Sequence, residues 1–464
     1  MGGQQFASGG VVLDTRSLDR ILDFDAERGI VEVEAGIEWP RLVRELRSRQ
    51  RGRPMPWGIA QKQTGADRLT LGGALGANVH GRGLRMKPFV GDVESFVLVD
   101  ARGEARECSR TANADLFRLA IGGYGLFGVV HSVRLRLVPL RKIRRVVEIL
   151  DARDLPHAFE HRIAEGCLYG DFQFSCAERS EGFLRRGVFS CYRPVDDATP
   201  IPEAQRRLSA KDWAEMLYLA HTDKEEAFRR YAAHYRSTAG QVYWTDTHQL
   251  SYYLDDYHRA LDERLGAPEP ASEIIGEIYV PRGALVSFLE TARDSLRASR
   301  ADVIYGTVRL IERDDETFLA WAREAYACVV FNLHTPHTVE GIERSAEAFR
   351  GLISDGIALG GSHYLTYHRF ATREQVLACY PQMPEFLRLK RLHDPEVRFE
   401  SEWYRHHVRQ LGAGAFRPCV PRERPACATV FAASPGAGGP PRQDRPEARS
   451  ERPALPLFLY SSAT

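Results

Sequence analysis

The sequence lacks the cysteine spacing of a zinc site or of a disulfide-rich secreted scaffold, because none of its 8 cysteines forms a C-x-x-C pair. A reducing compartment, the cytoplasm, is therefore the expected location. The first residues, 1–6, show no basic region followed by an apolar run, which argues against a signal peptide. Apolar runs of about 18 residues are also missing, so we expect no transmembrane segment.

An excess of charge of either sign is missing as well. The 63 Lys and Arg residues nearly balance the 62 Asp and Glu residues, leaving a net charge of +1. This balance argues against nucleic acid or an acidic membrane surface as a general partner, and a small-molecule substrate is expected instead. With 464 residues, 44% of them hydrophobic, the chain is long enough for two or three ordinary globular domains.

The periodicity of apolar residues divides the chain into three parts. Residues 11–139 read as short strands alternating with helices, with strands expected at 29–36, 93–99 and 129–138 and helices at 39–46 and 116–121. Residues 142–357 are more aromatic, with strands expected at 169–174 and 241–244 and helices at 207–236 and 285–297. A third stretch opens at Gly360 and Gly361, with a strand at 363–368 and a helix at 380–392.

The last segment has a different composition. Nine of the 25 prolines fall in residues 411–464, together with Gly, Ala, Ser and Arg. This composition is typical of a disordered tail, and a tail without function is favoured over a binding motif.

The most informative run lies at residues 63–83, with six glycines between Gly65 and Gly83. Glycine permits close approach of the backbone to a ligand, and successive N–H groups can bind an anion such as a pyrophosphate. A set of tight turns is the alternative interpretation of such a cluster. No strand–GxGxxG–helix unit surrounds the run, so it is not a Rossmann fingerprint, and no G-x-S-x-G elbow supports a hydrolase.

A second glycine run, at residues 121–130, precedes the strand expected at 129–138. Alone it would read as a turn, but the two runs at this separation form a specific combination. Together they resemble the FAD-binding domain of the vanillyl-alcohol-oxidase/p-cresol-methylhydroxylase superfamily, and within it the sugar-lactone oxidases and decaprenylphosphoryl-ribose 2-oxidases.

The resemblance implies an α+β fold: a two-lobed PCMH-type FAD-binding domain, its first lobe incomplete, with an inserted α+β substrate or cap domain. The implied division is 1–141 for the N-terminal part of the FAD-binding domain, 142–357 for the cap domain, 358–410 for a C-terminal return segment, and 411–464 for the tail.

The resemblance also implies the residues that hold FAD. Gly65, Thr70, Leu71, Gly72 and Gly73 would contact the diphosphate and ribityl chain. The flavin ring would lie beside His80, Gly81, Arg82, Gly83 and Tyr364, and the backbone of Val130 would contact the adenine end. Lys62 and Arg82 are basic residues of this region that could equally be ordinary surface charges.

The family's Gly-Gly-x-x-Tyr-Leu-x-Lys pattern is matched from Gly360 onward, except that Tyr367 stands where the family has its Lys. A neutral phenol stabilises negative charge only by hydrogen bonding. His368, the next residue, could act as a base, since histidine titrates near neutral pH. Tyr367 and His368 are therefore the catalytic candidates; on a strand they would point to opposite faces, so only one is expected to face the flavin.

The start of the chain departs from the family in another way. The family's pyrophosphate loop, Gly-x-Gly-(His or Arg)-Ser-like, would include only Gly2, Gly3 and Gln4 of this chain, with Met1 inside the loop. A fragment or a mis-assigned start is expected from this comparison, with any covalent flavin-linking histidine lying upstream.

The function that these motifs imply is an FAD-dependent oxidoreductase that oxidises a CH–OH group of a sugar, aldonolactone or polyol, passing electrons to oxygen, a quinone or a carrier. The alternatives are a flavin-dependent C=C reductase related to sterol reductases, and a degenerate flavoprotein fragment. His334, His337 and His363 are conceivable metal ligands, but no carboxylate has a matching spacing, so no metal site is expected.

Overall fold

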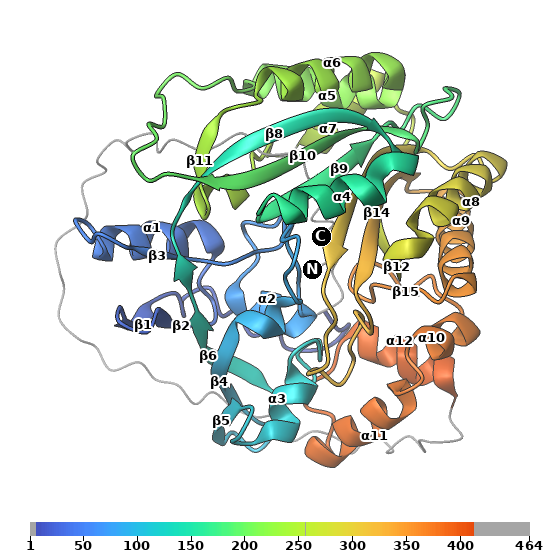
Figure 1. The fold of residues 1–464 in the computed structure, drawn as a ribbon. Coiled ribbons are helices and arrows are strands. Elements are labelled where there is room, and N and C mark those ends of the chain that lie inside the picture. Colours follow the sequence, from blue (N-terminus) through green and yellow to red (C-terminus); the bar gives the residue numbers. More distant parts are fainter. Residues whose placement is uncertain (1–5, 256, 413–464) are drawn as a thin grey trace.

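The computed structural model describes residues 6–255 and 257–412, which build two main β-sheets with helices packed around them (Figure 1). The N-terminal sheet has five strands in the order β1-β2-β6-β4-β5, all antiparallel. Its strands are β1 (Ile21–Asp25), β2 (Ile30–Glu34), β4 (Val93–Val99), β5 (Ala105–Ser109) and β6 (Val129–Arg136). A two-stranded ribbon of β3 (Trp57–Gly58) and β7 (Val138–Pro139) leads out of it.

Three helices accompany the N-terminal sheet: α1 (Trp39–Arg49), α2 (Leu71–Ala77) and α3 (Ala114–Ala120). Helix α1 has proline in its first turn, where the missing N–H costs nothing. It buries Trp39, Leu42, Val43 and Leu46, the spacing of one helical face. The strands expected at 29–36, 93–99 and 129–138 and both N-terminal helices are confirmed.

The large sheet has eight strands in the order β11-β8-β10-β9-β13-β14-β12-β15. They are β8 (Lys142–Asp151), β9 (Tyr169–Phe174), β10 (Arg186–Val195), β11 (Val242–Trp244), β12 (Ala271–Pro281), β13 (Val303–Ile311), β14 (Tyr326–Pro336) and β15 (Ser362–His363). The associated helices are α4 (Leu155–Ala164), α5 (Ala210–Thr222), α6 (Lys224–Ser237), α7 (Tyr257–Leu265), α8 (Leu285–Ala298) and α9 (Val339–Ala358). Short 3-10 turns occur at Phe89–Asp92, Ala152–Asp154, Thr247–Gln249 and Arg282–Ala284.

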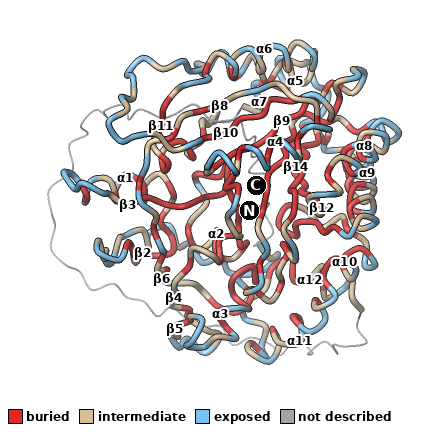
Figure 2. The backbone as a smooth tube through the Cα atoms, viewed as in Figure 1, coloured by how far each residue is buried: buried red, intermediate tan, exposed pale blue. Residues whose placement is uncertain are grey.

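The two faces of the large sheet differ in chemistry. One face is apolar and packs on α4 and α8, as in the ring contacts of Phe189 with Phe159 and of Phe331 with Phe288. Because side chains alternate along a strand, the intervening residues point to the opposite face. That second face carries buried polar side chains. Figure 2 shows buried segments both in the large sheet and in the N-terminal part.

Three C-terminal helices complete the described chain: α10 (Arg373–Cys379), α11 (Met383–His393) and α12 (Glu402–Leu411). They lie next to the N-terminal part (Figure 1). The ring of Trp403 in α12 stacks on Tyr124 at 4.5 Å, and Phe386 in α11 meets Phe127 at 5.3 Å. The end of the chain therefore supports the second glycine run.

Three secondary-structure predictions need correction. The helix expected at 207–236 is two helices, because Asp223 accepts a hydrogen bond from the N–H of Glu226 and begins α6 directly after α5. The strand expected at 363–368 ends at His363 as β15, and residues 365–367 form a turn instead. The helix expected at 380–392 begins only at Met383.

Residues 413–464 of the expected tail lie outside the described residues. Within the described part, no helix combines the length and apolar character needed to cross a membrane.

A buried ion pair in α11 generates a stability prediction. Lys390 and Asp394 are buried and hydrogen-bonded to each other, and Asp394 also accepts hydrogen bonds from the N–H groups of Arg398 and Phe399. Asp394→Ala leaves a buried ammonium and two N–H groups without this partner. We expect the free energy of unfolding, measured by denaturant titration, to fall by about 3 to 5 kcal/mol.

The matched control is Glu385→Ala in the same helix, which breaks the exposed pair with Arg388. Such a pair contributes at most about 1 kcal/mol. Equal losses in the two variants would contradict the assignment.

Candidate functional site

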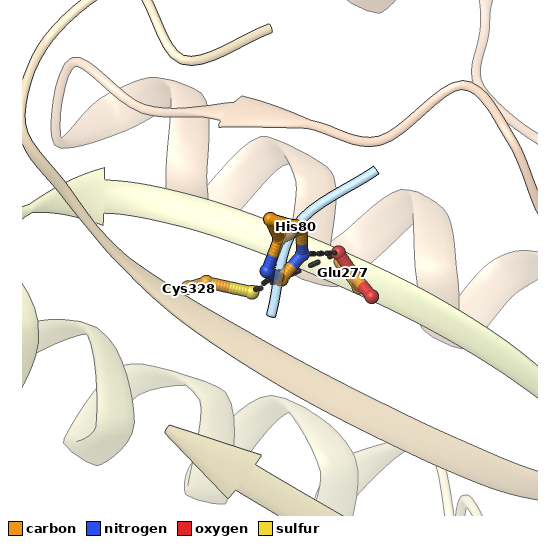
Figure 3. Close-up of side chains that lie close together, drawn as sticks. All are labelled: His80, Glu277 and Cys328. Atoms are coloured by element: carbon orange, nitrogen blue, oxygen red, sulfur yellow. Dashed lines mark hydrogen bonds and ion pairs between the residues drawn. The ribbon is translucent and has the colours of Figure 1, made fainter. Parts of the chain in front are cut away.

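The carboxylate of Glu277 is the meeting point of three segments that are distant in the sequence. Glu277 lies on β12, and its Oε2 is 2.8 Å from Nε2 of His80, which belongs to the first glycine run. Figure 3 shows these two side chains with Cys328 of β14, whose Sγ is 3.7 Å from the same carboxylate. All three residues are buried.

Two tyrosines donate the remaining hydrogen bonds to Glu277. The hydroxyl of Tyr279 donates to Oε2 at 2.7 Å, and that of Tyr367 donates to Oε1 at 2.8 Å. Nε2 of Gln63 in turn donates to the Tyr367 hydroxyl at 3.1 Å. The first glycine run, the large sheet and the C-terminal segment thus share one hydrogen-bond network.

The charge state of Glu277 follows from these neighbours. Burial alone would raise its pKa, but attraction and the hydrogen bond from His80, together with the charge of Arg309, outweigh burial and hold the pKa of Glu277 at about 2. The carboxylate is therefore ionised at neutral pH.

Further charged side chains are buried around this network. Nζ of Lys62 lies 2.7 Å from Asp67, and the guanidinium of Arg82 lies 3.3 Å from Asp171 on β9. Burial lowers the pKa of Lys62, which its ion pair with Asp67 partly offsets. The interpretation of Lys62 and Arg82 as ordinary surface charges is wrong, because their exposed fractions are 1% and 3%.

The buried polar side chains continue across the polar face of the large sheet. In the strand register, Tyr192 pairs with both Arg145 and Tyr169, and Cys328 pairs with both Arg309 and Tyr279. The polar face therefore runs from β8 across to β12.

Residues 82–84 join the N-terminal part to this sheet. Gly83 forms an isolated bridge with Tyr169, while the N–H groups of Gly170 and Leu84 complete the pairing with Arg82 and Leu168 at 2.9 and 3.0 Å. The N–H of Gly81 donates to Gln61 at 3.2 Å, and a Cβ on Gly81 would lie 2.8 Å from the carbonyl oxygen of Lys62. Glycine is needed here for the close approach of two backbone segments.

The two glycine runs contact each other, as their combination in the sequence suggests. The N–H of Tyr124 donates to the carbonyl of Gly76 at 2.9 Å, and that of Gly122 donates to Leu75 at 3.0 Å. Gly125 has a φ of +73° with open space where a Cβ would stand.

The segment Gly65 to Gly73 is held mainly by internal hydrogen bonds. The Thr70 hydroxyl accepts from the N–H of Gly73 at 3.2 Å and begins α2. The N–H groups of Leu71 and Gly72 donate to the carbonyls of Ile37 and Ala35. Close backbone approach, rather than these N–H groups, is what the segment offers a ligand.

Gly65 itself is bound by the segment after β11. Its N–H donates to Ser251 at 3.0 Å, and its carbonyl accepts from Tyr253 at 2.6 Å. Val130 lies on β6 at the N-terminal sheet, half-buried and paired with Leu98. Gly2, Gly3 and Gln4 lie outside the described residues.

The C-terminal segment supplies one catalytic candidate to the network and not the other. Tyr364 donates its hydroxyl to the carbonyl of Ala77 at 2.6 Å, and its ring meets that of Tyr367. His368 instead packs between Phe349 and Phe370, with ring distances of 4.3 and 4.7 Å. Burial there lowers the pKa of His368 to about 3. Of the two candidates, only Tyr367 therefore belongs to the Glu277 network.

Sequence analysis did not identify Glu277, Asp171 or Arg309 as site residues. Each is a charged residue in the middle of a strand whose neighbours are apolar or aromatic. A charged position inside a buried strand is unusual unless that charge is paired, and this was the available signal.

The donor set fits the cofactor that the glycine runs suggest. FAD carries a negatively charged diphosphate and a ring with polar edges. Buried cations at Lys62, Arg82 and Arg309 would stabilise negative charge, and the tyrosine hydroxyls and Gln63 offer hydrogen bonds to a polar ring.

Comparison with known proteins concerns the N-terminal part of the chain. Residues 1–109 match the family model for the FAD binding domain. Cytokinin dehydrogenase 4 of Oryza sativa subsp. japonica is 32% identical over 159 residues, covering 32% of this chain and 28% of that protein. Decaprenylphosphoryl-β-D-ribose oxidase of Mycolicibacterium smegmatis is 30% identical over 134 residues, covering 28% and 27%.

L-gulonolactone oxidase of Mus musculus is 32% identical over 131 residues, covering 28% of each chain. The chain thus matches little more than a quarter of the length of these relatives. Residues 1–109 include the first glycine run, so the resemblance of that run to an FAD-binding domain is confirmed. Residues 1–109 are thus similar to the FAD binding domain family, and this match indicates FAD as the cofactor.

Proposed function

We propose that the chain is an FAD-dependent oxidoreductase that oxidises a CH–OH group of a sugar, aldonolactone or polyol. The observation that carries the proposal is the buried Glu277 network, in which a carboxylate that is ionised at neutral pH accepts a hydrogen bond from the hydroxyl of Tyr367 beside the first glycine run. Loss of hydride from a CH–OH carbon requires that the hydroxyl proton be removed as well.

FAD, when bound, supplies the acceptor for the hydride. Tyr367 is placed to relay the proton: its oxygen takes the proton of the substrate hydroxyl while its own proton passes to Oε1 of Glu277, 2.8 Å away. His80 and Tyr279 hold the other oxygen of Glu277 and fix the carboxylate. In this scheme Tyr367 is the catalytic residue, and Glu277, whose pKa is about 2, takes the proton only transiently before it is released to solvent.

The polar face of the large sheet supports the choice of a hydroxylated substrate. Arg145, Asp171 and Gln173 are buried polar groups on this face, extending away from Glu277, and Gln173 donates a hydrogen bond to the half-buried Tyr305. Groups that hydrogen-bond to substrate hydroxyls discriminate strongly against analogues that lack them. A substrate with several hydroxyls fits such a surface better than an apolar one.

The fold division implied by the resemblance is part of the same proposal. Residues 142–357 supply seven strands of the large sheet and would form the inserted cap domain. The segment 358–410 adds β15 to that sheet and packs α11 and α12 on the second glycine run, as a return segment would.

A visible spectrum and a substrate panel test the activity. The purified protein, supplied with FAD, is expected to show flavin bands near about 370 and 450 nm. Anaerobic addition of sugars, aldonolactones and polyols should bleach the longer-wavelength band, whereas matched deoxy compounds should not. A protein that takes up no FAD, or is bleached by NAD(P)H alone, would contradict the proposal.

Substitution of the relay residue tests the mechanism. Tyr367→Phe keeps the ring but removes the hydroxyl, and should slow flavin reduction by the substrate on the order of 10²- to 10⁴-fold. The matched control is Tyr404→Phe in α12, which removes the hydroxyl of a buried tyrosine that is not part of the Glu277 network. FAD content should equal that of the wild type in both, and an unchanged reduction rate in Tyr367→Phe would exclude the relay.

The pKa of Glu277 predicts how stability depends on pH. Its pKa of about 2 lies below the ordinary 4.5, so its ionisation stabilises the folded chain above about pH 4.5, and this contribution is lost as pH falls towards 2. Denaturant titrations of wild type and Glu277→Gln should show a difference in unfolding free energy that shrinks over this window. Because Glu277 is buried, added salt should leave the trend in place. A difference independent of pH would contradict the assignment.

A further inference from the structure

A second buried carboxylate, Glu273, precedes Glu277 by four residues on β12 and is surrounded by histidines. Nε2 of His221 on α5 lies 3.2 Å from Oε1, and Nδ1 of His334 on β14 lies 3.3 Å from the same oxygen. Nδ1 of His258 on α7 lies 3.1 Å from Oε2, which also accepts the hydroxyl of Tyr257 at 2.7 Å. The Glu273 side chain is 1% exposed.

The contacts of His221 aim its Nε2 at the carboxylate. Its Nδ1 is 2.9 Å from the carbonyl of Leu217, which can only accept, so this nitrogen carries a hydrogen. Nε2 lies 3.2 Å from Oε1 of Glu273, where a proton or a metal ion can supply the positive charge between the two atoms.

The spacing of the ligand atoms fits a metal ion. Zinc binds nitrogen and carboxylate oxygen at about 2.0 to 2.2 Å, so neighbouring ligands of a tetrahedral site lie about 3.3 to 3.5 Å apart. The two nitrogen–oxygen distances of 3.2 and 3.3 Å match this edge. The donor atoms of His221, Glu273 and His334 all lie within 4.8 Å of one another.

We propose that His221, Glu273 and His334 bind one divalent transition-metal ion of the zinc class, with the fourth coordination position open to water. Two imidazoles and one carboxylate favour zinc over magnesium or calcium, which prefer oxygen ligands. His258 and Tyr257 hold the second oxygen of Glu273 and orient it. The bound ion would connect α5 to the ends of β12 and β14.

This site is separate from the flavin network and does not rest on the proposed oxidation. It shares no residue with the Glu277 network, and the partly exposed side chains of His334 and His258, at 19% and 23%, give an ion access from solvent. His334 was weighed as a ligand in the sequence together with His337 and His363. The structure pairs His337 with Ser272 and buries His363 beside Tyr380 instead.

The test uses the full chain with FAD, stripped of metal with a chelator and titrated with Zn²⁺ by calorimetry. We expect one equivalent to bind. His221→Ala and His334→Ala should each weaken binding on the order of 100-fold or more, and His258→Ala, which acts through Glu273, on the order of 10-fold. The matched control is His337→Ala, which should bind as the wild type does.

Co²⁺ bound to the unaltered chain gives a readout that no variant's folding can disturb. Visible absorption bands of four-coordinate Co²⁺ that disappear on adding Zn²⁺ support the site. Absence of stoichiometric binding by the wild type, or unchanged affinity in a folded His221→Ala variant, would overturn the proposal. Flavin content of each variant reports its folding, so failure of the metal site is distinguishable from failure of the FAD site.

Discussion

The structure depends on keeping the buried carboxylate of Glu277 paired. A carboxylate taken out of water costs several kcal/mol unless hydrogen bonds and opposite charge replace its hydration. Here those partners come from His80, Tyr279 and Tyr367, which lie in the first glycine run, the large sheet and the C-terminal segment. Separating any one of the three segments would leave the charge partly unpaired. The carboxylate therefore couples the N-terminal part to the large sheet, and the same pairing fixes the Tyr367 hydroxyl.

The large sheet makes this coupling possible because one of its faces is apolar and the other is polar. Phenylalanines such as Phe189 and Phe331 on one face pack on α4 and α8, which removes apolar surface from water. That packing stabilises the sheet independently of its other face. The opposite face can then carry buried ion pairs such as Arg82–Asp171, which contribute little to stability. Polar groups retained at such a cost are typical of a binding surface.

Local patterns in the sequence were sufficient for some features of the site and insufficient for others. The glycine runs follow from backbone geometry, which acts over a few residues, and so the segment around His80 was predictable. Glu277 and Arg309 are ordinary charged residues in sequence, and only the pairing of distant strands makes them neighbours. His368 lies outside the Glu277 network because the expected strand ends at His363, after which the chain turns and places the His368 ring against Phe349. His334 needed the partners His221 and Glu273, which are 113 and 61 residues away in the sequence.

The tyrosine at position 367, where the resemblance leads one to expect lysine, is understandable from the charges around it. His80 and Arg309 already act on Glu277, and Lys62 and Arg82 are buried nearby. A further ammonium at position 367 would add a desolvated positive charge next to these groups, and like charges in a buried site repel strongly. A phenol donates a hydrogen bond to Glu277 without adding charge. The positive potential that a lysine would provide is thus supplied by other elements of the fold, and the hydroxyl at position 367 keeps a hydrogen bond to Glu277.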